Sequence, residues 1–253
     1  MWITEPTPKD LNPYYQSEDY ISHSDRSDTL FEKLYQRVKA YSLNKKLRLL
    51  TRYTKSRGRL LDYGAGTGAF VQQAQKGGWH AEGVEPNELA RLRAREKGLS
   101  LEQSWKALSK GGYDVITLWH VLEHLPDLEN SITRIYQLLK PNGILVLALP
   151  NFKSWDAQHY GSFWAGYDVP RHLWHFSRES VEALFSTHGF ELQKTHPLYF
   201  DAFYVSLLSE KYRTGKMRWL SAIINGIRSN TKAISSGEYS SLIYVLKKTQ
   251  KAF

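Results

Sequence analysis

The chain of 253 residues contains no cysteine, which excludes any chemistry that needs a cysteine nucleophile and fits a cytoplasmic protein. No apolar run approaches the roughly 20 residues that span a bilayer. The N-terminal Met-Trp-Ile-Thr-Glu-Pro lacks the basic start and apolar core of a signal peptide. There is also no internal repeat and no low-complexity run. These absences predict a cytoplasmic globular protein. The length of 253 residues fits one large or two small domains.

Glycine is concentrated in one short segment, where residues 60–68 read Leu-Leu-Asp-Tyr-Gly-Ala-Gly-Thr-Gly. The apolar start predicts a buried strand, and residues 68–77 can continue as a helix. Glycine permits positive φ and lets a ligand approach the backbone closely. The segment therefore predicts a strand, glycine turn and helix that form the nucleotide-binding corner of a doubly wound α/β sheet.

The residue before the glycines favours one nucleotide over another. Gly64, Gly66 and Ala69 also satisfy the dinucleotide pattern G-x-G-x-x-G/A, in which the turn receives a doubly anionic pyrophosphate. A carboxylate at Asp62 would repel that group. S-adenosylmethionine carries an ammonium and a sulfonium and no phosphate, so an acid attracts it. Asp62 therefore favours S-adenosylmethionine over NAD.

A second acid follows the next predicted strand, 80–84. Glu85 comes roughly 20 residues after the glycine turn, the spacing at which an acid reaches ribose hydroxyls in such folds. A carboxylate can accept from both the 2′ and 3′ hydroxyls. Asn87 is a candidate N-cap of the helix that follows. The alternative is an exposed glutamate in an ordinary loop, and the glycine turn favours the ribose contact.

The motifs in this order resemble those of class I S-adenosylmethionine-dependent methyltransferases. The matching segments are 60–68, Gly-Val-Glu-Pro-Asn at 83–87, Tyr-Asp-Val-Ile-Thr-Leu-Trp-His-Val-Leu-Glu-His-Leu at 113–125, and 138–151. The third is similar to the subgroup of ubiquinone-biosynthesis O-methyltransferases. The resemblance, which covers roughly residues 55–200, implies a mostly parallel, doubly wound, seven-stranded Rossmann-like sheet. It also implies these cofactor-binding residues: Asp62, Gly64, Ala65, Gly66, Gly68, Phe70, Glu85, Pro86, Asn87, Ser104, Trp105, Trp119, His120 and Val121.

Alternating elements support that fold. We expect strands near 59–63, 80–84, 99–102, 113–118, 143–149, 190–196 and 241–248, and helices near 27–52, 68–77, 87–97 and 128–139. Residues 1–54 are predicted to form an N-terminal helical cap, in which Ser27 or Asp28 starts the helix and Tyr14, Tyr15 and Tyr20 either line the cofactor pocket or pack elsewhere. Residues 55–253 form the main domain, with an inserted amphipathic segment at 204–240. That segment is predicted to be a lid, a homodimer contact or a membrane-surface helix.

The loop after the fifth strand is dense in aromatic rings and imidazoles. It contains Asp-Val-Pro-Arg-His-Leu-Trp-His-Phe-Ser at 168–177, and Ser177 is a candidate helix N-cap. A hydroxyl acceptor needs a general base, which we assign first to His172 and second to His175. Arg171 is a candidate for binding an acceptor carboxylate or phosphate. Alternatively, Arg171 pairs with Asp168, and the histidines hydrogen-bond within the loop.

A second pair of histidines follows the fourth strand. His120 is predicted to contact the cofactor, and Glu123-His124 to order the start of the next helix. In the loop after the fifth strand, two histidines could also suggest a metal, but no acidic cluster completes a ligand set with His172 and His175. We therefore predict no metal.

Nucleic acid is disfavoured as the acceptor. Methylation at C5 of cytosine needs a cysteine, and the Asn/Asp-Pro-Pro-Tyr motif of amino-group DNA methyltransferases is absent. The net charge of +9 comes from 34 basic and 25 acidic residues that are interspersed along the chain, which favours a solvated basic surface. A phosphorylated or lipid-surface acceptor stays open.

The sequence therefore predicts transfer of a methyl group from S-adenosylmethionine, leaving S-adenosylhomocysteine, to a small-molecule acceptor. A hydroxyl oxygen on a bulky, aromatic or lipidic acceptor fits the aromatic loop. Two alternatives stay open. One is an NAD(P)-dependent oxidoreductase, and the other is a non-catalytic module that binds S-adenosylmethionine or S-adenosylhomocysteine.

Overall fold

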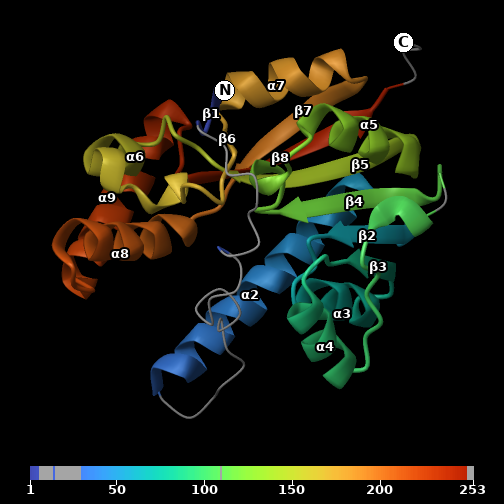
Figure 1. Cartoon of the computed structure of the whole chain (residues 1–253), viewed down its shortest axis with the longest axis horizontal. Coiled ribbons are helices and arrows are strands. Elements are labelled where there is room, and N and C mark those ends of the chain that lie inside the picture. The colour runs from blue at the N-terminus through green and yellow to red at the C-terminus, as the bar shows by residue number, and fades with distance from the viewer. Residues whose placement is uncertain (6–13, 15–29, 109, 250–253) are drawn as a thin grey trace. The chain divides into compact units, whose positions relative to one another are not determined.

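The computed structural model describes residues 1–5, 14, 30–108 and 110–249 (Figure 1). The strands of these residues form a six-stranded sheet in the order β3-β2-β4-β5-β8-β7 and a two-stranded sheet of β1 and β6. The described residues divide into two compact units. One, the nucleotide unit, draws on 10–118 and 134–145, and the other, the histidine unit, draws on 1–9, 119–133 and 146–253. Tyr15, Tyr20, Ser27 and Asp28, to which roles were assigned above, lie outside the described residues.

The nucleotide unit is built on parallel strands. β2 (Arg59–Tyr63) pairs in parallel with β3 (His80–Val84) on one side and with β4 (Tyr113–Trp119) on the other. Leu60, Leu61 and Val115 are buried, as expected for strands covered on both faces, whose sequences are continuous apolar runs. The helices are α2 (Leu30–Tyr53), α3 (Ala69–Lys76) and α4 (Glu88–Glu96). The strands predicted at 59–63, 80–84 and 113–118 and the helices predicted at 68–77 and 87–97 are confirmed, and α2 covers the described part of the helix predicted at 27–52.

One predicted strand is almost absent. Residues 99–102 contribute a single parallel bridge, between Glu102 and Val84, and a short 3-10 turn η2 (Trp105–Ala107) follows. The main sheet of the described residues therefore has six strands instead of the predicted seven. Leu99 and Leu101 are buried, which is the apolar pattern that suggested a strand.

The histidine unit ends in the predicted final pair of strands. β7 (Phe190–Pro197) and β8 (Ser241–Lys248) pair antiparallel, with a register shift between Leu192 and Lys194. Ser177 caps α7 (Arg178–Thr187), as predicted, in a capping box with Ser180. Two more elements run across the division between the units, α5 (Leu128–Leu138) and β5 (Leu139–Pro150).

The inserted segment is a helical hairpin of α8 (Asp201–Thr214) and α9 (Trp219–Ser236), visible in orange and red in Figure 1. It packs on α6 (Trp155–Tyr160) through the buried carboxylates of Asp156 and Glu210. Ser229 of α9 donates to Asp156 of α6 at 2.6 Å, and Tyr160 of α6 donates to Glu210 of α8 at 3.2 Å. None of the described helices is long and apolar enough to cross a membrane.

The remaining elements of the histidine unit are short. β1 (Trp2–Ile3) pairs antiparallel with β6 (Trp174–His175), a pairing that the sequence did not predict because two-residue strands have no readable period. Three 3-10 turns complete the unit: η3 (Leu122–His124), η4 (Gly161–Phe163) and η5 (Ala165–Tyr167).

Candidate functional site

The glycine turn has the conformation that its sequence requires. Gly64, Gly66 and Gly68 have φ of 74°, 54° and 75°, which side-chain-bearing residues rarely adopt. The amides of Gly64 and Ala65 both donate to the carbonyl of Val84, at 2.8 and 3.0 Å, which fixes the turn against the end of β3.

The glycines differ in what surrounds them. A Cβ added at Gly68 would lie 2.5 Å from Leu99 Cδ1, so this glycine is needed for packing. A Cβ at Gly66 would meet no atom of the described residues within 4 Å. The backbone at Gly66 therefore borders open space that a ligand can enter, which fits the predicted cofactor.

Asp62 lies at the end of β2, immediately before the turn. It is 2% exposed and accepts a hydrogen bond of 2.6 Å from the hydroxyl of Thr117. Burial raises the pKa of Asp62 to about 7, against the lowering effects of Thr117 and Lys46. The carboxyl group therefore changes charge near neutral pH.

Glu85 joins the turn to the end of β3. One carboxylate oxygen accepts from the amide of Gly66 and the other from the amide of Asn87, both at 2.8 Å. Burial raises the pKa of Glu85, although these two amides and Arg91 act in the opposite direction. Asn87 caps α4 by accepting from the amide of Ala90 at 3.0 Å, which confirms the predicted N-cap.

The loop at 104–108 carries an aromatic contact that the sequence did not reveal. Trp105 stacks on Tyr63 with ring centroids 4.2 Å apart. Arg134 donates to the carbonyls of Trp105 and Leu108 at 3.0 and 2.8 Å, which fixes the loop. The other predicted cofactor residues of this unit are buried Ala65 and Phe70, partly buried Ser104 and exposed Pro86.

Trp119, His120 and Val121, the other predicted cofactor residues, belong to the histidine unit. His120 has a φ of 57° and lies between two acids. Its Nε2 is 2.9 Å from Asp201 Oδ2, and its Nδ1 is 3.4 Å from Glu123 Oε1. Burial alone would lower the pKa of His120, but Asp201 and Glu123 overcome this effect and raise the pKa to about 10.

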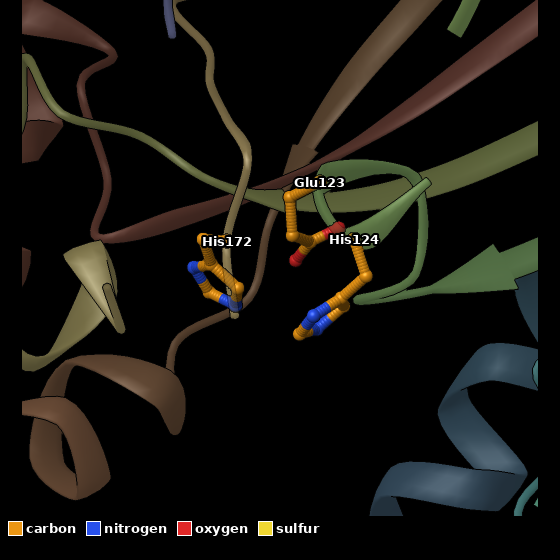
Figure 2. A group of neighbouring side chains, drawn as sticks. All are labelled: Glu123, His124 and His172. Atoms are coloured by element: carbon orange, nitrogen blue, oxygen red, sulfur yellow. The ribbon is translucent and has the colours of Figure 1, made fainter. Parts of the chain in front are cut away.

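Figure 2 shows Glu123, His124 and His172 turned toward one another. One potential ligand atom from each side chain lies within 4.8 Å of the others. Glu123 is completely buried. Burial lowers the pKa of His124 to about 4 and also lowers the pKa of His172. The prediction of no metal relied on the absence of an acidic cluster beside the loop histidines, and it did not consider that Glu123, from another part of the chain, lies beside His172.

The loop holding His172 is tied down at several points. His172 Nδ1 is 2.9 Å from the carbonyl of Gly166, and the amide of Leu173 donates to the carbonyl of Glu123 at 2.8 Å. Thr4 donates its hydroxyl to the carbonyl of His172 at 2.7 Å, and the same hydroxyl lies 3.0 Å from His175 Nε2. The N-terminal residues thus help to hold both histidines.

Arg171 forms an ion pair with Asp168, with Nη2 2.6 Å from Oδ1. This is the contact expected if Arg171 orders the loop. Asp168 also lines a pocket of about 470 Å³, a size that suits a small molecule. The other lining residues are Ser162, Trp164, Tyr167, Val169 and Tyr212.

Sequence reasoning thus found the histidines but missed their acidic neighbours. The acid Asp201, which pairs with His120, and the hydroxyl of Thr4, which holds the His172 loop, are far from the histidines in sequence and belong to no motif. Glu123 had a usable signal, because an acid between two histidines in His-x-x-Glu-His is placed beside both of them.

A family model described as "Methyltransferase domain" matches residues 34–195 of the chain. The ubiquinone biosynthesis O-methyltransferase of Histophilus somni is 36% identical over 113 residues, covering 38% of this chain and 48% of that protein. The chain spans about half the length of the curated relatives it matches.

Solved methyltransferase structures share the fold. Geranyl diphosphate C-methyltransferase from Streptomyces coelicolor A3(2) gives a TM-score of 0.58 at 12% identity, covering 90% of this chain and 89% of that one. Phosphoethanolamine N-methyltransferase 2 from Haemonchus contortus gives 0.57 at 16% identity, covering 82% and 53%.

Proposed function

The chain belongs to the class I S-adenosylmethionine-dependent methyltransferases, and from that membership we propose that it methylates a hydroxyl oxygen of a small, bulky aromatic or lipidic molecule. The observation that carries the proposal is the open backbone at Gly66, bordered by Glu85 and preceded by buried Asp62. The O-methyltransferase relative supports oxygen as the acceptor atom.

S-adenosylmethionine, when bound, supplies an activated methyl group on a positively charged sulfur. We assign its ribose hydroxyls to Glu85, whose oxygens each accept one amide and retain lone pairs for further donors. Asp62 supplies negative charge that favours a cationic ligand and disfavours a pyrophosphate, which argues against the oxidoreductase alternative. The full proposed cofactor set comprises Asp62, Gly64, Ala65, Gly66, Gly68, Phe70, Glu85, Pro86, Asn87, Ser104, Trp105, Trp119, His120 and Val121.

The acceptor side is assigned to the histidine unit. A hydroxyl acceptor must lose its proton as its oxygen bonds to the methyl carbon, while the carbon–sulfur bond breaks and its electron pair stays on sulfur. In the simplest form of the proposal, His172 takes that proton. Because His175 and Arg171 are bound to Thr4 and Asp168, we propose that they position His172 and the pocket wall.

The pocket beside Asp168 is our candidate for the acceptor. Its walls include the rings of Trp164, Tyr167 and Tyr212, which suit a planar or apolar molecule. A cytoplasmic location, a homodimer and peripheral membrane contact stay predictions.

Turnover tests the proposed function. The full chain is incubated with methyl-labelled S-adenosylmethionine and a panel of phenols, hydroxylated lipids and other metabolites, and labelled products are separated. We expect label on an oxygen atom in at least one product, with stoichiometric S-adenosylhomocysteine. Binding of the cofactor without turnover over a wide panel would favour the non-catalytic alternative.

A further inference from the structure

Glu123, His124 and His172 form a side-chain cluster with the composition of a metal site. We propose that these three residues bind one divalent transition-metal ion of the zinc class. One carboxylate and two imidazoles are a common protein ligand set for zinc, and they leave a coordination position open for a water or a substrate oxygen. Magnesium and calcium prefer oxygen ligands and fit the set poorly.

Both imidazoles are held in the orientation that a metal ligand needs. His124 Nδ1 is 3.1 Å from the carbonyl of Arg171, and His172 Nδ1 is 2.9 Å from the carbonyl of Gly166. A carbonyl oxygen can only accept, so each Nδ1 carries the hydrogen and the lone pair of a neutral ring is on Nε2, which in His172 lies 3.7 Å from Asp168 Oδ2. Backbone carbonyls orient metal-binding histidines in this way in known sites.

Glu123 supplies the charge that a cation would neutralise. Its side chain is 1% exposed, and within the described ranges neither carboxylate oxygen receives a hydrogen bond. The nearby His120 Nδ1 lies 3.4 Å from one oxygen, while the other nitrogen of His120 lies closer to Asp201, at 2.9 Å. His120 is thus shared between two carboxylates, and a bound metal ion would stabilise the buried Glu123 carboxylate further.

The geometry needs only a small adjustment. Ligand atoms around a tetrahedral zinc lie roughly 3.3–3.5 Å apart, given bonds of about 2.0–2.2 Å. One potential ligand atom from each side chain lies within 4.8 Å of the other two. Side-chain rotations that move these atoms by about 1 Å would bring them to the spacing that zinc requires. Its frame is already fixed, because the amide of Leu173 and the indole of Trp174 donate to the carbonyls of Glu123 and Leu125, both at 2.8 Å.

The site deepens the proposed function and, for its catalytic role, depends on it. A cation at the open position would lower the pKa of an acceptor hydroxyl bound to it, and the proton would leave to solvent. His172 would then act as a ligand instead of the general base. The metal site itself is independent of turnover and can be tested on the protein alone.

The test uses the full chain, stripped with a chelator and then titrated with Zn²⁺ without S-adenosylmethionine. We expect one equivalent to bind, and Co²⁺ in place of Zn²⁺ to give the visible spectrum of a nitrogen- and oxygen-ligated, low-coordinate ion. We expect each of three variants to bind Zn²⁺ at least about 10–100-fold more weakly than the parent, which is the loss seen when a residue that only supports a metal ligand is removed. The variants are Glu123→Gln, His124→Gln and His172→Gln. His80→Gln, at the exposed first residue of β3, is the control that should bind as the parent does.

Thermal unfolding guards against variants that fail to fold. Zn²⁺ should raise the melting temperature of the parent and of His80→Gln. At the same Zn²⁺ concentration it should raise that of the three ligand variants, each folded by circular dichroism, clearly less. Equal Zn²⁺ affinity in the ligand variants and the parent, or no stoichiometric binding to the parent, would overturn the metal site. Label transfer by a protein that binds no metal would overturn this inference alone, and metal binding without cofactor binding would overturn the proposed function alone.

Discussion

Glu85 accepts a hydrogen bond of 2.8 Å from the backbone amide of Gly66, which joins the glycine turn to the end of the neighbouring strand. Glu85 was predicted to contact the ribose from its distance along the chain to the glycine turn, and Gly66 is the glycine whose backbone borders open space. The same carboxylate can hold the turn in shape and still receive hydroxyl donors from a ligand. This relationship places the proposed ribose contact and the open backbone at one position.

Replacing Glu85 by glutamine should weaken S-adenosylmethionine binding by about 10–100-fold, because hydrogen bonds to a charged group contribute about 1.5–3 kcal/mol. Isothermal titration calorimetry measures the affinity. Glu88→Gln is the matched control. Glu88 is the exposed first residue of α4, three residues after Glu85, and this variant should bind as the parent does. Equal affinities in the two variants would remove Glu85 from the site.

Alanine at the two glycines should separate ligand binding from folding. At Gly66 the positive φ costs about 1–2 kcal/mol of stability, and the new methyl group enters the space assigned to the cofactor. At Gly68 the same φ cost is joined by a clash with Leu99 at 2.5 Å. Urea unfolding should therefore show the larger loss of stability for Gly68→Ala. Calorimetry on folded protein should show the larger loss of affinity for Gly66→Ala, and the reverse order would contradict the assignment of Gly66.

The titration of Asp62 predicts a pH dependence of cofactor binding. Its pKa is about 7 in the folded protein, so the cationic cofactor should bind more tightly as pH rises from 6 to 8 and the carboxylate forms. Calorimetry across this range should show the rise in the parent and a flat profile in Asp62→Asn. A flat parent profile would show that Asp62 carries no charge near the ligand.

Stability of the cofactor-free protein should change with pH in the opposite direction. The folded state holds the Asp62 proton up to about pH 7, whereas the unfolded state releases it near 3.8. Folding therefore loses stability as pH rises between these values, by at most about 4 kcal/mol from this group. Asp62→Asn should be more stable than the parent at pH 8, as measured by urea unfolding.

Removing the Thr4 hydroxyl should impair turnover more than cofactor binding. Thr4→Val keeps the shape but loses the bonds to the His172 carbonyl and to His175 Nε2. We expect a fall in kcat of about tenfold, because small displacements of a catalytic group are costly. S-adenosylmethionine affinity should stay within about twofold of the parent. Thr51→Val, at an exposed helix position with a similar hydroxyl-to-carbonyl bond, serves as the control.

Local patterns predicted the nucleotide unit well because its signals lie close together in the chain. The turn at 64–68, the acid at Glu85 and the cap at Asn87 each follow directly from a strand end. The prediction of a strand at 99–102 was wrong except for one bridge. An apolar run indicates that a segment is buried, but it does not show that the segment pairs with a sheet.

The histidine cluster was harder to predict because its contacts are long-range. Thr4 meets His172 across 168 residues, and no periodic pattern records such a contact. Glu123 was interpreted as a residue that orders a helix start, yet it is fully buried beside three imidazoles. Burial changed the chemistry assigned to it, and burial of a single polar residue is not visible in sequence.

Calorimetric titration of the full chain with S-adenosylmethionine and, separately, with NADH tests the central claim most directly. The account predicts one S-adenosylmethionine bound per chain, with binding weakened in Glu85→Gln and unchanged in Glu88→Gln, and no binding of NADH. Binding of NADH without S-adenosylmethionine would contradict it.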